Sequence, residues 1–306
     1  MTGTLYLGSK PVMWSPVEKT ALAEAEVEYH DRKTDAIWVK FRPVEGSLVF
    51  WDSFQDGRNV TSDRLTNPLN QEFVTRDHTV SIVIWTTTPW TIPQNRAICY
   101  NPLLPYHAYE VVATEDECWS KPGEVLIIAA NLADDTMKAA RITSFRDLGG
   151  LDVNFFHLIK CAHPFQGVEG ANDEWDFPVR LLPGDHVTDE AGTGFVHTAP
   201  SHGDDDYQIG RKYDLPMTHN IRDDSCFRDD IPFFAGERII TESGKAGDAN
   251  KAVIDKLVEV GALLARKRIT ISDAHSWRSK APVIRLNRPQ WFAAIDRAVG
   301  DGQDQY

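Results

Sequence analysis

Two short stretches of the sequence gather side chains that could do chemistry. The first, "SIVIWTTTPWTIPQNRA" at 81–97, places four threonines around one tryptophan where an apolar run ends; these are Thr86, Thr87, Thr88, Thr91 and Trp90. Hydroxyls both donate and accept hydrogen bonds, so this set suits a pocket that holds a water molecule beside a carbonyl. The alternative is a strand end that is rich in threonine only because threonine favours β structure.

The second stretch is "GTGFVHTAPSHGDDDYQIG" at 192–210, where His197 and His202 precede three aspartates. Three interpretations stay open. Histidines and carboxylates are metal ligands, although Pro200 between the two histidines keeps them off one helix face. Aspartates also stabilise a helix N-terminus without any further function. Finally, an aspartate could bind a small cationic group while His197 shapes the neighbouring pocket.

Together the two stretches favour an aminoacyl ester as the ligand. Such an ester needs polar groups around its carbonyl, an anion for its α-ammonium group and a bounded pocket for its side chain. The hydroxyls and the tryptophan supply the first and last of these, and the histidine–aspartate stretch supplies the anion.

Composition and charge limit the classes of protein. The chain has 306 residues, of which 42% are hydrophobic and 25% charged, as in ordinary globular proteins. The 45 acidic against 32 basic residues argue against strong nonspecific binding of nucleic acid. If RNA touches the chain, its late basic residues are one place to look, although they also fit a solvated face: Arg266, Lys267, Arg268, Arg278, Lys280, Arg285, Arg288 and Arg297.

The sequence shows no apolar run of membrane-spanning length and no signal peptide near Met1. The four cysteines are scattered and form no CxxC pair, so neither a metal framework nor a disulfide framework is expected. We therefore expect a cytoplasmic protein without membrane contact.

Hydrophobic periodicity predicts more strands than helices. We expect a half-buried strand at 35–41, strands buried on both faces at 79–85 and 123–130, and a short strand at 192–199. Helices are expected at 249–264, at 131–140 capped by Asn131, and at 201–212 capped by Ser201, while 21–28 has helix-forming composition. Because the strands are not regularly interleaved with helices, an α+β fold is predicted, built around a barrel or a strongly bent sheet with peripheral helices.

The two stretches also resemble the signature segments of a known protein family. The segments "WTTTPWTIPQNRA" and "GTGFVHTAPSHGDDDY" resemble the two signatures of the connective-peptide editing domain of class I aminoacyl-tRNA synthetases, and the isoleucyl branch is most similar. The flanks at 11–29 and 276–292 resemble the joints to the catalytic domain. The resemblance implies a β-barrel-like editing domain at 35–270, between joint segments at 1–34 and 271–306.

The synthetic motifs H-x-G-H and K-M-S-K-S are absent from the sequence. An excised editing domain is therefore expected rather than a working synthetase. ATP and Mg²⁺ serve the missing synthetic domain, so this chain is expected to hold no cofactor and no metal.

The implied function is hydrolysis of mischarged valyl-tRNA(Ile), and of valyl-adenylate as a second substrate. A site for isoleucine cannot strongly exclude valine, because one methylene is worth only about 1–3 kcal/mol, a limit for which isoleucyl-tRNA synthetase is itself the standard example. The implied partner is the 3′ end of tRNA(Ile) carrying a noncognate amino acid, chiefly valine. A monomer is expected.

By resemblance, the threonines surround the ester. Thr87 and Thr88 would line the ester and its attacking water, and both count as catalytic. Thr86 and Thr91 would support them in binding the substrate.

The remaining roles are also implied by the resemblance. Trp90 would form a wall of the side-chain pocket, and Asn95 would position the terminal adenosine or the water. His197 would limit the size of the pocket and so exclude isoleucine. Asp206 would bind the α-ammonium group, with Asp205 as the fallback because consecutive aspartates leave the spacing ambiguous.

The mechanism stays open between two routes. Direct attack by a water, held by threonine hydroxyls and the free ribose hydroxyl, competes with His197 acting as general base. No Ser-His-Asp or Cys-His set indicates a covalent intermediate. The alternative functions are a noncatalytic tRNA-docking module, a metal-dependent hydrolase that uses both histidines, and the editing domain of the valyl or leucyl relative.

Overall fold

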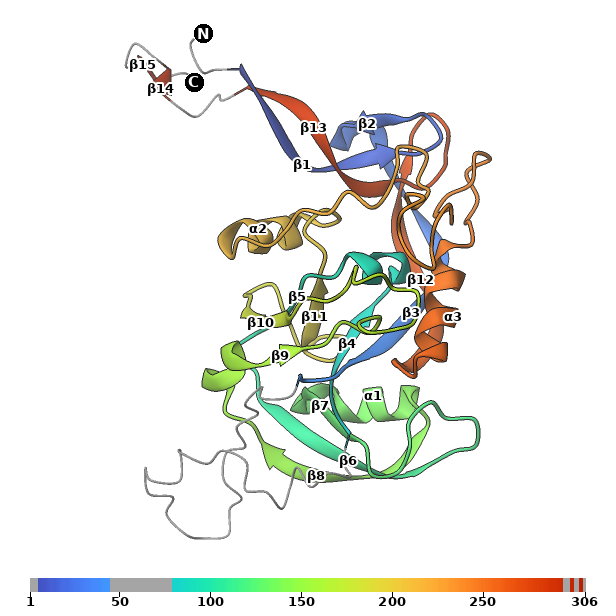
Figure 1. The fold of residues 1–306 in the computed structure, drawn as a ribbon. Helices are drawn as coiled ribbons and strands as arrows, with labels where there is room; N and C mark the ends of the chain where they lie inside the picture. The colour runs from blue at the N-terminus through green and yellow to red at the C-terminus, as the bar shows by residue number, and fades with distance from the viewer. Residues whose placement is uncertain (1–4, 45–78, 294–297, 300–302, 305–306) are drawn as a thin grey trace.

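The computed structural model describes residues 5–44, 79–293, 298–299 and 303–304 of the chain (Figure 1). Strands dominate this part, and its α-helices are α1 (Ala133–Ala139), α2 (Asp204–Lys212) and α3 (Ala249–Glu259). The α+β prediction is confirmed, with the strands arranged in open sheets of six, four, three and two strands. No helix within the described ranges is long and apolar enough to cross a membrane.

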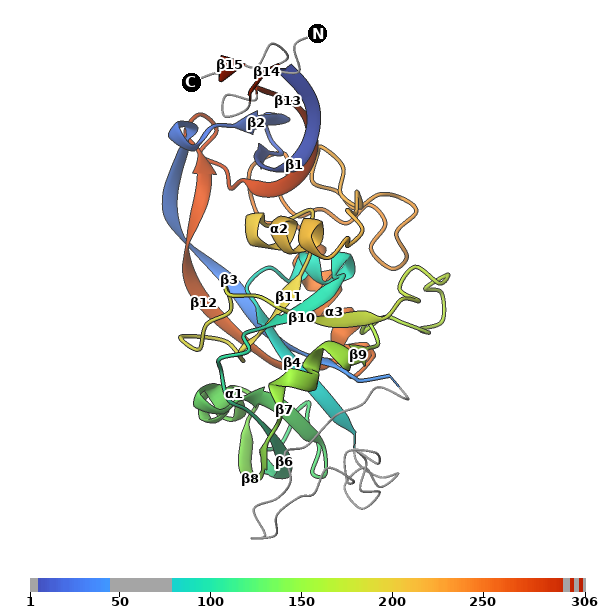
Figure 2. The same cartoon turned by 90° about the vertical axis from the view of Figure 1, so that its left-hand side faces the viewer.

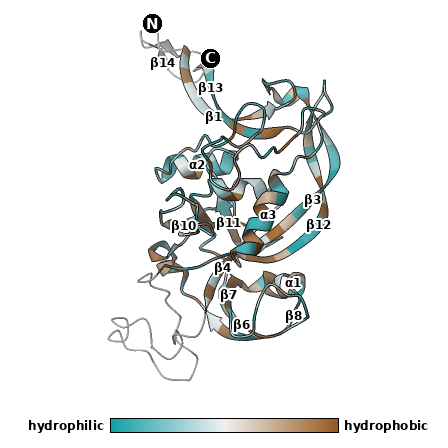
Figure 3. Cartoon of the chain, turned by 45° about the vertical axis from the view of Figure 1, so that its right-hand side comes forward, coloured by the Kyte–Doolittle hydropathy of each residue, from teal (hydrophilic) through white to brown (hydrophobic). Residues whose placement is uncertain are grey.

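The largest sheet contains the centre of the hydrophobic core. Its strands, in spatial order, are β12 (Leu263–Ser276), β3 (Val27–Phe41), β4 (Val80–Thr86), β7 (Val125–Ala129), β6 (Tyr106–Thr114) and β8 (Ile142–Gly150). Figure 3 shows β4, β7 and β6 in the brown of hydrophobic residues where these strands meet inside the body. Ile82, Val83 and Ile84 of β4 are fully buried, so the strand that carries the threonines is held firmly on both faces.

Two smaller sheets complete the frame. One has the order β11 (Phe195–Thr198), β5 (Ala97–Tyr100), β10 (Val179–Pro183) and β9 (Lys160–Cys161). The other has the order β13 (Ile284–Ala293), β1 (Leu5–Ser15) and β2 (Thr20–Leu22). The short strands β14 (Ala298–Val299) and β15 (Gln303–Asp304) pair with each other, and the 3₁₀ helices are η1 (Glu24–Glu26), η3 (Pro89–Gln94), η4 (Ala130–Leu132) and η5 (Val153–Leu158).

The strand predicted at 35–41 is present, but its predicted half-buried alternation is wrong. Trp38 and Lys40 are 8% and 4% exposed, although they alternate with the fully buried Ile37 and Val39. The reason is that both faces of this part of β3 are covered, since all residues of 34–41 are buried, and its edges are paired with β12 and β4. The Lys40 ammonium is buried beside the Glu124 carboxylate at 3.1 Å, which compensates the loss of solvation.

The helical composition of 21–28 does not produce an α-helix. The chain forms β2, then the single turn η1, and enters β3 at Val27. From Val27 onward, β3 pairs continuously with β12, and this long-range pairing outweighs the local helix propensity.

The predicted helices at 131–140, 201–212 and 249–264 exist, but two predicted caps are wrong. The Asn131 side chain donates to Asp189 at 2.7 Å, and α1 begins only at Ala133, after η4. Gly203, not Ser201, caps α2. The third helix ends at Glu259, two residues before Gly261, whose φ of 68° is the left-handed conformation that terminates helices.

The predicted domain boundaries at 34/35 and 270/271 both cut the β3–β12 ribbon, in which Thr34 pairs with Ile269. This ribbon runs without interruption along one side of the molecule (Figure 2). At the far end, β1 pairs with β13 over ten residue pairs, so the predicted joint segments lie side by side. The boundaries themselves stay a prediction.

Candidate active site

The threonine stretch folds into a connected row of hydroxyls where β4 ends. The chain turns after Thr86 and enters η3, whose first residue is Pro89, a favourable position for proline. The Thr88 backbone N–H donates to Thr86 Oγ1 at 3.1 Å, and the Thr86 and Thr88 hydroxyl oxygens also lie 3.1 Å apart. Thr88 Oγ1 lies 3.3 Å from Thr91 Oγ1, so three of the four predicted threonines are linked.

The row of hydroxyls ends on His197. Thr91 Oγ1 lies 2.9 Å from His197 Nε2 and donates its only proton to the Thr88 carbonyl at 2.8 Å. With the Thr91 proton on the carbonyl, the network favours the tautomer in which Nε2 carries the proton and donates it to Thr91. The other ring nitrogen, Nδ1, then accepts from the Asn95 amide group at 3.5 Å.

His197 is neutral at physiological pH. His197 is only 6% exposed, and burial lowers the pKa of its imidazole to about 4, with a smaller contribution from nearby His202. The strand β11 pairs with β5 so that His197 faces Ile98 in the register, which brings the second signature stretch against the first.

Two side chains from a distant loop and the neighbouring Arg96 hold η3 in place. Each binds a backbone carbonyl near the end of η3, where the Ile92 carbonyl also accepts from the Asn95 backbone N–H at 3.0 Å. His163 Nε2 donates to the Ile92 carbonyl at 3.0 Å, and Trp175 Nε1 donates to the Pro93 carbonyl at 2.9 Å. Arg96 donates to the Asn95 carbonyl at 2.7 Å, while its guanidinium lies over the Phe177 ring.

None of these three supporting side chains was identified from the sequence. No sequence pattern could have identified His163 or Trp175, because a buried histidine or tryptophan in a loop looks like an ordinary core residue. They contribute to the site by position only, since each binds a backbone carbonyl.

A cavity of about 260 Å³ opens beside the threonines. One wall consists of Thr87, Thr88, Trp90 and Thr91. The other lining residues come from β1, β3, β12, β13, α3 and the loops between them: Met13, Tyr29, Arg32, His202, Ile239, Ile240, Asn250, Ser272, Asp273, Ala274, Val283, Ile284 and Arg285. The volume suits a small acyl group, since pockets for drug-sized ligands measure roughly 300–1,000 Å³.

Trp90 is fixed from two sides. Its backbone N–H donates to Asn250 Oδ1 at 3.0 Å, and its ring meets the ring of His202 edge-on at 4.8 Å between centroids. Both the backbone and the ring of Trp90 are therefore held in place beside the cavity.

Five predicted site residues do not line this cavity. Thr86 lies at the end of β4, behind the Thr88 hydroxyl to which it is linked. Asn95 and His197 lie behind Thr91, where Asn95 also donates to the Ala97 carbonyl at 2.9 Å. Asp205 is exposed on the first turn of α2. The partly buried Asp206 carboxylate folds back toward Gly203, and burial raises its pKa to about 7 despite a hydrogen bond from the Ala199 backbone.

His202, which the sequence offered only as a metal ligand, lines the cavity. Its Nδ1 donates to the Arg285 carbonyl at 3.0 Å, so Nε2 is unprotonated, and burial lowers the pKa to about 4. Within the described ranges no cluster of three or more His, Cys, Asp and Glu side chains is arranged to hold a metal ion.

Comparison with known proteins defines the class. Residues 1–304 match the family of class I tRNA synthetases (I, L, M and V), and the chain belongs to this family. Its sequence is 49% identical over 313 residues to an isoleucine–tRNA ligase of Ruegeria pomeroyi, a match that covers the whole chain and 29% of that protein. An isoleucine–tRNA ligase of Caulobacter vibrioides is 46% identical over 309 residues, covering 97% of this chain and 28% of its own length.

The chain thus spans less than a third of the relatives it matches. Among solved structures, the editing domain of the P. falciparum cytosolic leucyl-tRNA synthetase matches with a TM-score of 0.41 and 16% identity, covering 59% of this chain and 67% of that one. Family membership therefore rests on the sequence matches.

The buried neutral histidines predict acid lability. His163, His197 and His202 have pKa values lowered by burial to about 3, 4 and 4, below their value in the unfolded chain. The unfolded chain binds more protons between about pH 6.5 and pH 4, so stability is lost as the pH falls through this window. The raised pKa of Asp206 has the opposite effect on stability over a similar pH range, but it is one group against three histidines.

We expect the urea midpoint of unfolding to fall between pH 7 and pH 5. A His163→Gln variant should show a smaller decrease, because one of the three groups no longer titrates. An equal decrease in the variant would contradict this assignment of the acid sensitivity.

Proposed function

We propose that the chain hydrolyses the ester of valine mischarged on tRNA(Ile). The observation that carries the proposal is the hydroxyl row of Thr86, Thr88 and Thr91, which ends on His197 beside a cavity of small-acyl size. The membership in the class I tRNA synthetases and the similarity to isoleucine–tRNA ligases support the choice of tRNA.

The hydrogen-bond directions favour a water held by hydroxyl oxygens. Thr91 accepts from His197 and donates to a carbonyl, so Thr88 donates to Thr91 and accepts from Thr86. One lone pair of Thr88 Oγ1 then remains for a water in the cavity. The Thr87 hydroxyl also lines the cavity and makes no hydrogen bond within the described part of the chain, so it is available to the ester.

The same directions disfavour His197 as general base. Its Nε2 carries a proton, and its Nδ1 accepts from Asn95 on the side away from Thr91. Neither nitrogen offers a lone pair to a water beside Thr88. Direct attack by the water, assisted by the free ribose hydroxyl, is therefore the proposed route, with neither ATP nor a metal ion required.

Substrate selection is proposed to depend on the wall formed by Thr91 and Trp90. Thr91 lines the cavity and contacts His197 on its other side, so the imidazole limits how far the Thr91 side chain can move away from a bound ligand. A pocket that rejects the larger isoleucyl group by a steric limit complements a synthetic site that cannot exclude valine.

The testing experiment is deacylation of preformed valyl-tRNA(Ile) by the purified chain. Isoleucyl-tRNA(Ile) is the control substrate, and both reactions are run with and without EDTA. Selective loss of valine that EDTA leaves unchanged is expected. Equal hydrolysis of both esters would reject the size limit, and inhibition by EDTA would favour a metal-dependent hydrolase.

Absence of any hydrolysis would favour a noncatalytic docking module. The valyl and threonyl esters of tRNA(Val) separate the remaining alternative, because an editing domain of the valyl relative should prefer the threonyl ester.

A further inference from the structure

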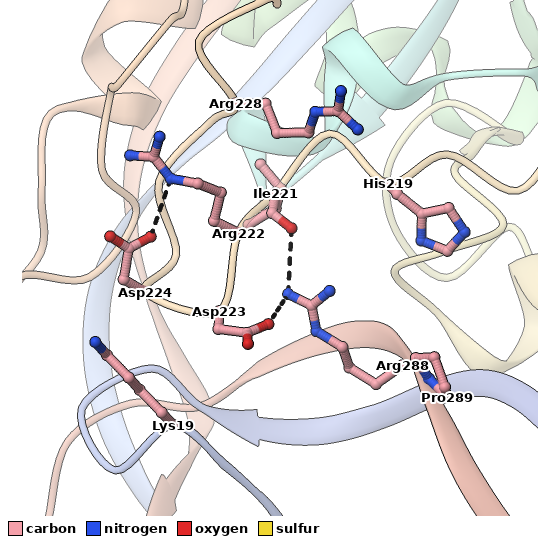
Figure 4. A pocket seen from close by; sticks show the side chains of 9 residues that line it. All are labelled: Lys19, His219, Ile221, Arg222, Asp223, Asp224, Arg228, Arg288 and Pro289. Atoms are coloured by element: carbon pink, nitrogen blue, oxygen red, sulfur yellow. Dashed lines mark hydrogen bonds and ion pairs between the residues drawn. The ribbon is translucent and has the colours of Figure 1, made fainter.

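A second hollow, of about 710 Å³, lies where the β1–β2 turn and β13 meet the loop at 219–228 (Figure 4). We call it the basic cleft; it is lined by Lys19, His219, Ile221, Arg222, Asp223, Asp224, Arg228, Arg288 and Pro289. Its four Lys and Arg side chains outnumber its two Asp side chains, whereas the whole chain has 32 basic and 45 acidic residues. The cleft therefore reverses the charge balance of the chain.

Arg288 is the fixed cation of the cleft. Its guanidinium lies over the Trp14 ring, donates to the Ile221 carbonyl at 3.3 Å and pairs with Asp223 (Figure 4). Trp14 Nε1 in turn donates to the Asp223 carbonyl at 2.8 Å. The side chain is only 19% exposed, and no described residue forms a hydrogen bond with its buried Nε. An anion in the cleft would therefore meet an arginine that is already oriented.

The other cations are exposed and can change partners. Lys19 is exposed and forms no ion pair within the described residues. The pair between Arg228 and Asp230 is 51% and 61% exposed, and the pair between Arg222 and Asp229 is 40% and 85% exposed. Exposed pairs of this kind contribute about 0–1 kcal/mol, so a phosphate can replace the aspartate at little cost.

The cleft lies beside the site cavity along one strand. Ile284 of β13 lines the cavity, and Arg288, four residues further along and on the same face of the strand, lines the cleft, roughly 13 Å away at about 3.3 Å per residue. Other late basic residues are engaged elsewhere, since Arg266 and Arg268 both bind Asp35. Of the late basic residues that the structure describes, Arg288 lines the basic cleft, and Arg285 lines the site cavity.

We propose that the basic cleft binds backbone phosphates of the single-stranded 3′ end of tRNA and directs this strand into the site cavity. Arginine guanidinium groups bind phosphate oxygens through paired hydrogen bonds, and the exposed lysine adds a point charge. The proposal rests on the proposed function, because it assumes that the cavity receives the terminal aminoacyl group.

The test measures binding of uncharged tRNA(Ile) to the full 306-residue chain by fluorescence anisotropy between about 50 and 200 mM salt. The test variant is Lys19→Ala/Arg228→Ala. The matched control is Arg146→Ala, which removes another exposed, ion-paired arginine, on β8 at the opposite end of the molecule (Figure 1).

The double variant should bind tRNA about tenfold more weakly at low salt, and its slope of log K against log salt should fall by about 1.4, or about 0.7 per lost phosphate contact. Arg146→Ala should keep the wild-type slope. A tRNA without its single-stranded 3′ end should bind both chains equally. An unchanged slope in the double variant, or the same loss in the control, would overturn the proposal.

A second readout separates the cleft from the reaction. The valyl ester of adenosine carries the ester and the nucleoside but no phosphate, so the double variant should hydrolyse it at the wild-type rate while its KM for valyl-tRNA rises. If the wild-type chain hydrolyses neither substrate, the proposed function fails, and the salt dependence of binding still decides whether the cleft binds RNA.

Discussion

Asp206→Asn is expected to lower hydrolysis of valyl-tRNA(Ile) by roughly 100-fold, the effect of losing about 3 kcal/mol of interaction with a charged group. The carboxylate is the proposed partner of the α-ammonium group, and asparagine keeps its shape without its charge. Asp206 does not line the cavity in the free protein. The variant therefore tests directly whether the ester reaches it.

The raised pKa of Asp206, about 7, gives the rate a characteristic pH dependence. Only the carboxylate binds an ammonium group, so the wild-type rate should rise as the pH passes 7. It should fall again as the α-amino group, with an ordinary pKa of about 7.7–8.0, loses its proton. Single-turnover deacylation between about pH 5 and pH 9 should lack the acid limb in Asp206→Asn.

The same substitution should stabilise the folded chain at neutral and alkaline pH. Because burial raises the pKa of Asp206, the folded chain holds a proton between about pH 3.8 and pH 7 that the unfolded chain releases. Stability contributed by this group therefore falls as the pH rises through that window, and asparagine removes the loss. A higher Tm at pH 8 together with lost activity is the expected result.

Asp205→Asn is the matched control, because Asp205 is the exposed neighbour on the same turn of α2. It should retain the wild-type rate and the acid limb. The opposite pattern, with Asp205→Asn inactive and Asp206→Asn active, would assign the ammonium group to Asp205.

His197→Ala should allow the chain to hydrolyse isoleucyl-tRNA(Ile). The substitution removes a buried imidazole that contacts Thr91 at 2.9 Å and leaves a void behind the cavity wall. The larger ester has one extra methylene, and admitting it should reduce the discrimination between the two esters by at least about tenfold. The measurement is the ratio of kcat/KM values for the valyl and isoleucyl esters.

His163→Ala provides the control for His197→Ala. His163 is 2% exposed, but it binds the Ile92 carbonyl and has no hydrogen bond to the threonines within the described structure. It should lower stability while leaving the ratio of rates near the wild-type value. If His197→Ala discriminates against the isoleucyl ester as strongly as the wild type does, the proposed steric limit is wrong.

The sequence predicted the parts of the site that local pattern determines. Thr86, Thr88 and Thr91 meet because a strand end followed by a tight turn brings nearby hydroxyls together. The buried strands around them were predictable from their continuous apolar runs. That the stretch with His197 would lie near the threonines was inferred from the needs of an aminoacyl ester, and the contact between His197 and Thr91 itself was not predicted.

What the sequence could not predict depends on contacts between distant segments. The support of η3 by His163 and Trp175 comes from a loop more than seventy residues away. The burial of Lys40 requires the Glu124 carboxylate, eighty-four residues later. Tyr29 and Arg32 line the cavity beside Ser272, Asp273 and Ala274 because β3 pairs with β12, across more than two hundred residues of sequence.

The positions of the cavity-lining residues determine how much of the chain is needed to enclose the cavity. Nine of the seventeen cavity-lining residues lie outside 35–270: Met13, Tyr29, Arg32, Ser272, Asp273, Ala274, Val283, Ile284 and Arg285. A fragment cut at the predicted domain boundaries would keep the hydroxyl row but lose half of its enclosure. The dimensions of the cavity therefore depend on the junction between the body and the paired strands β1, β3, β12 and β13, and bending that junction would change the size of ligand that fits.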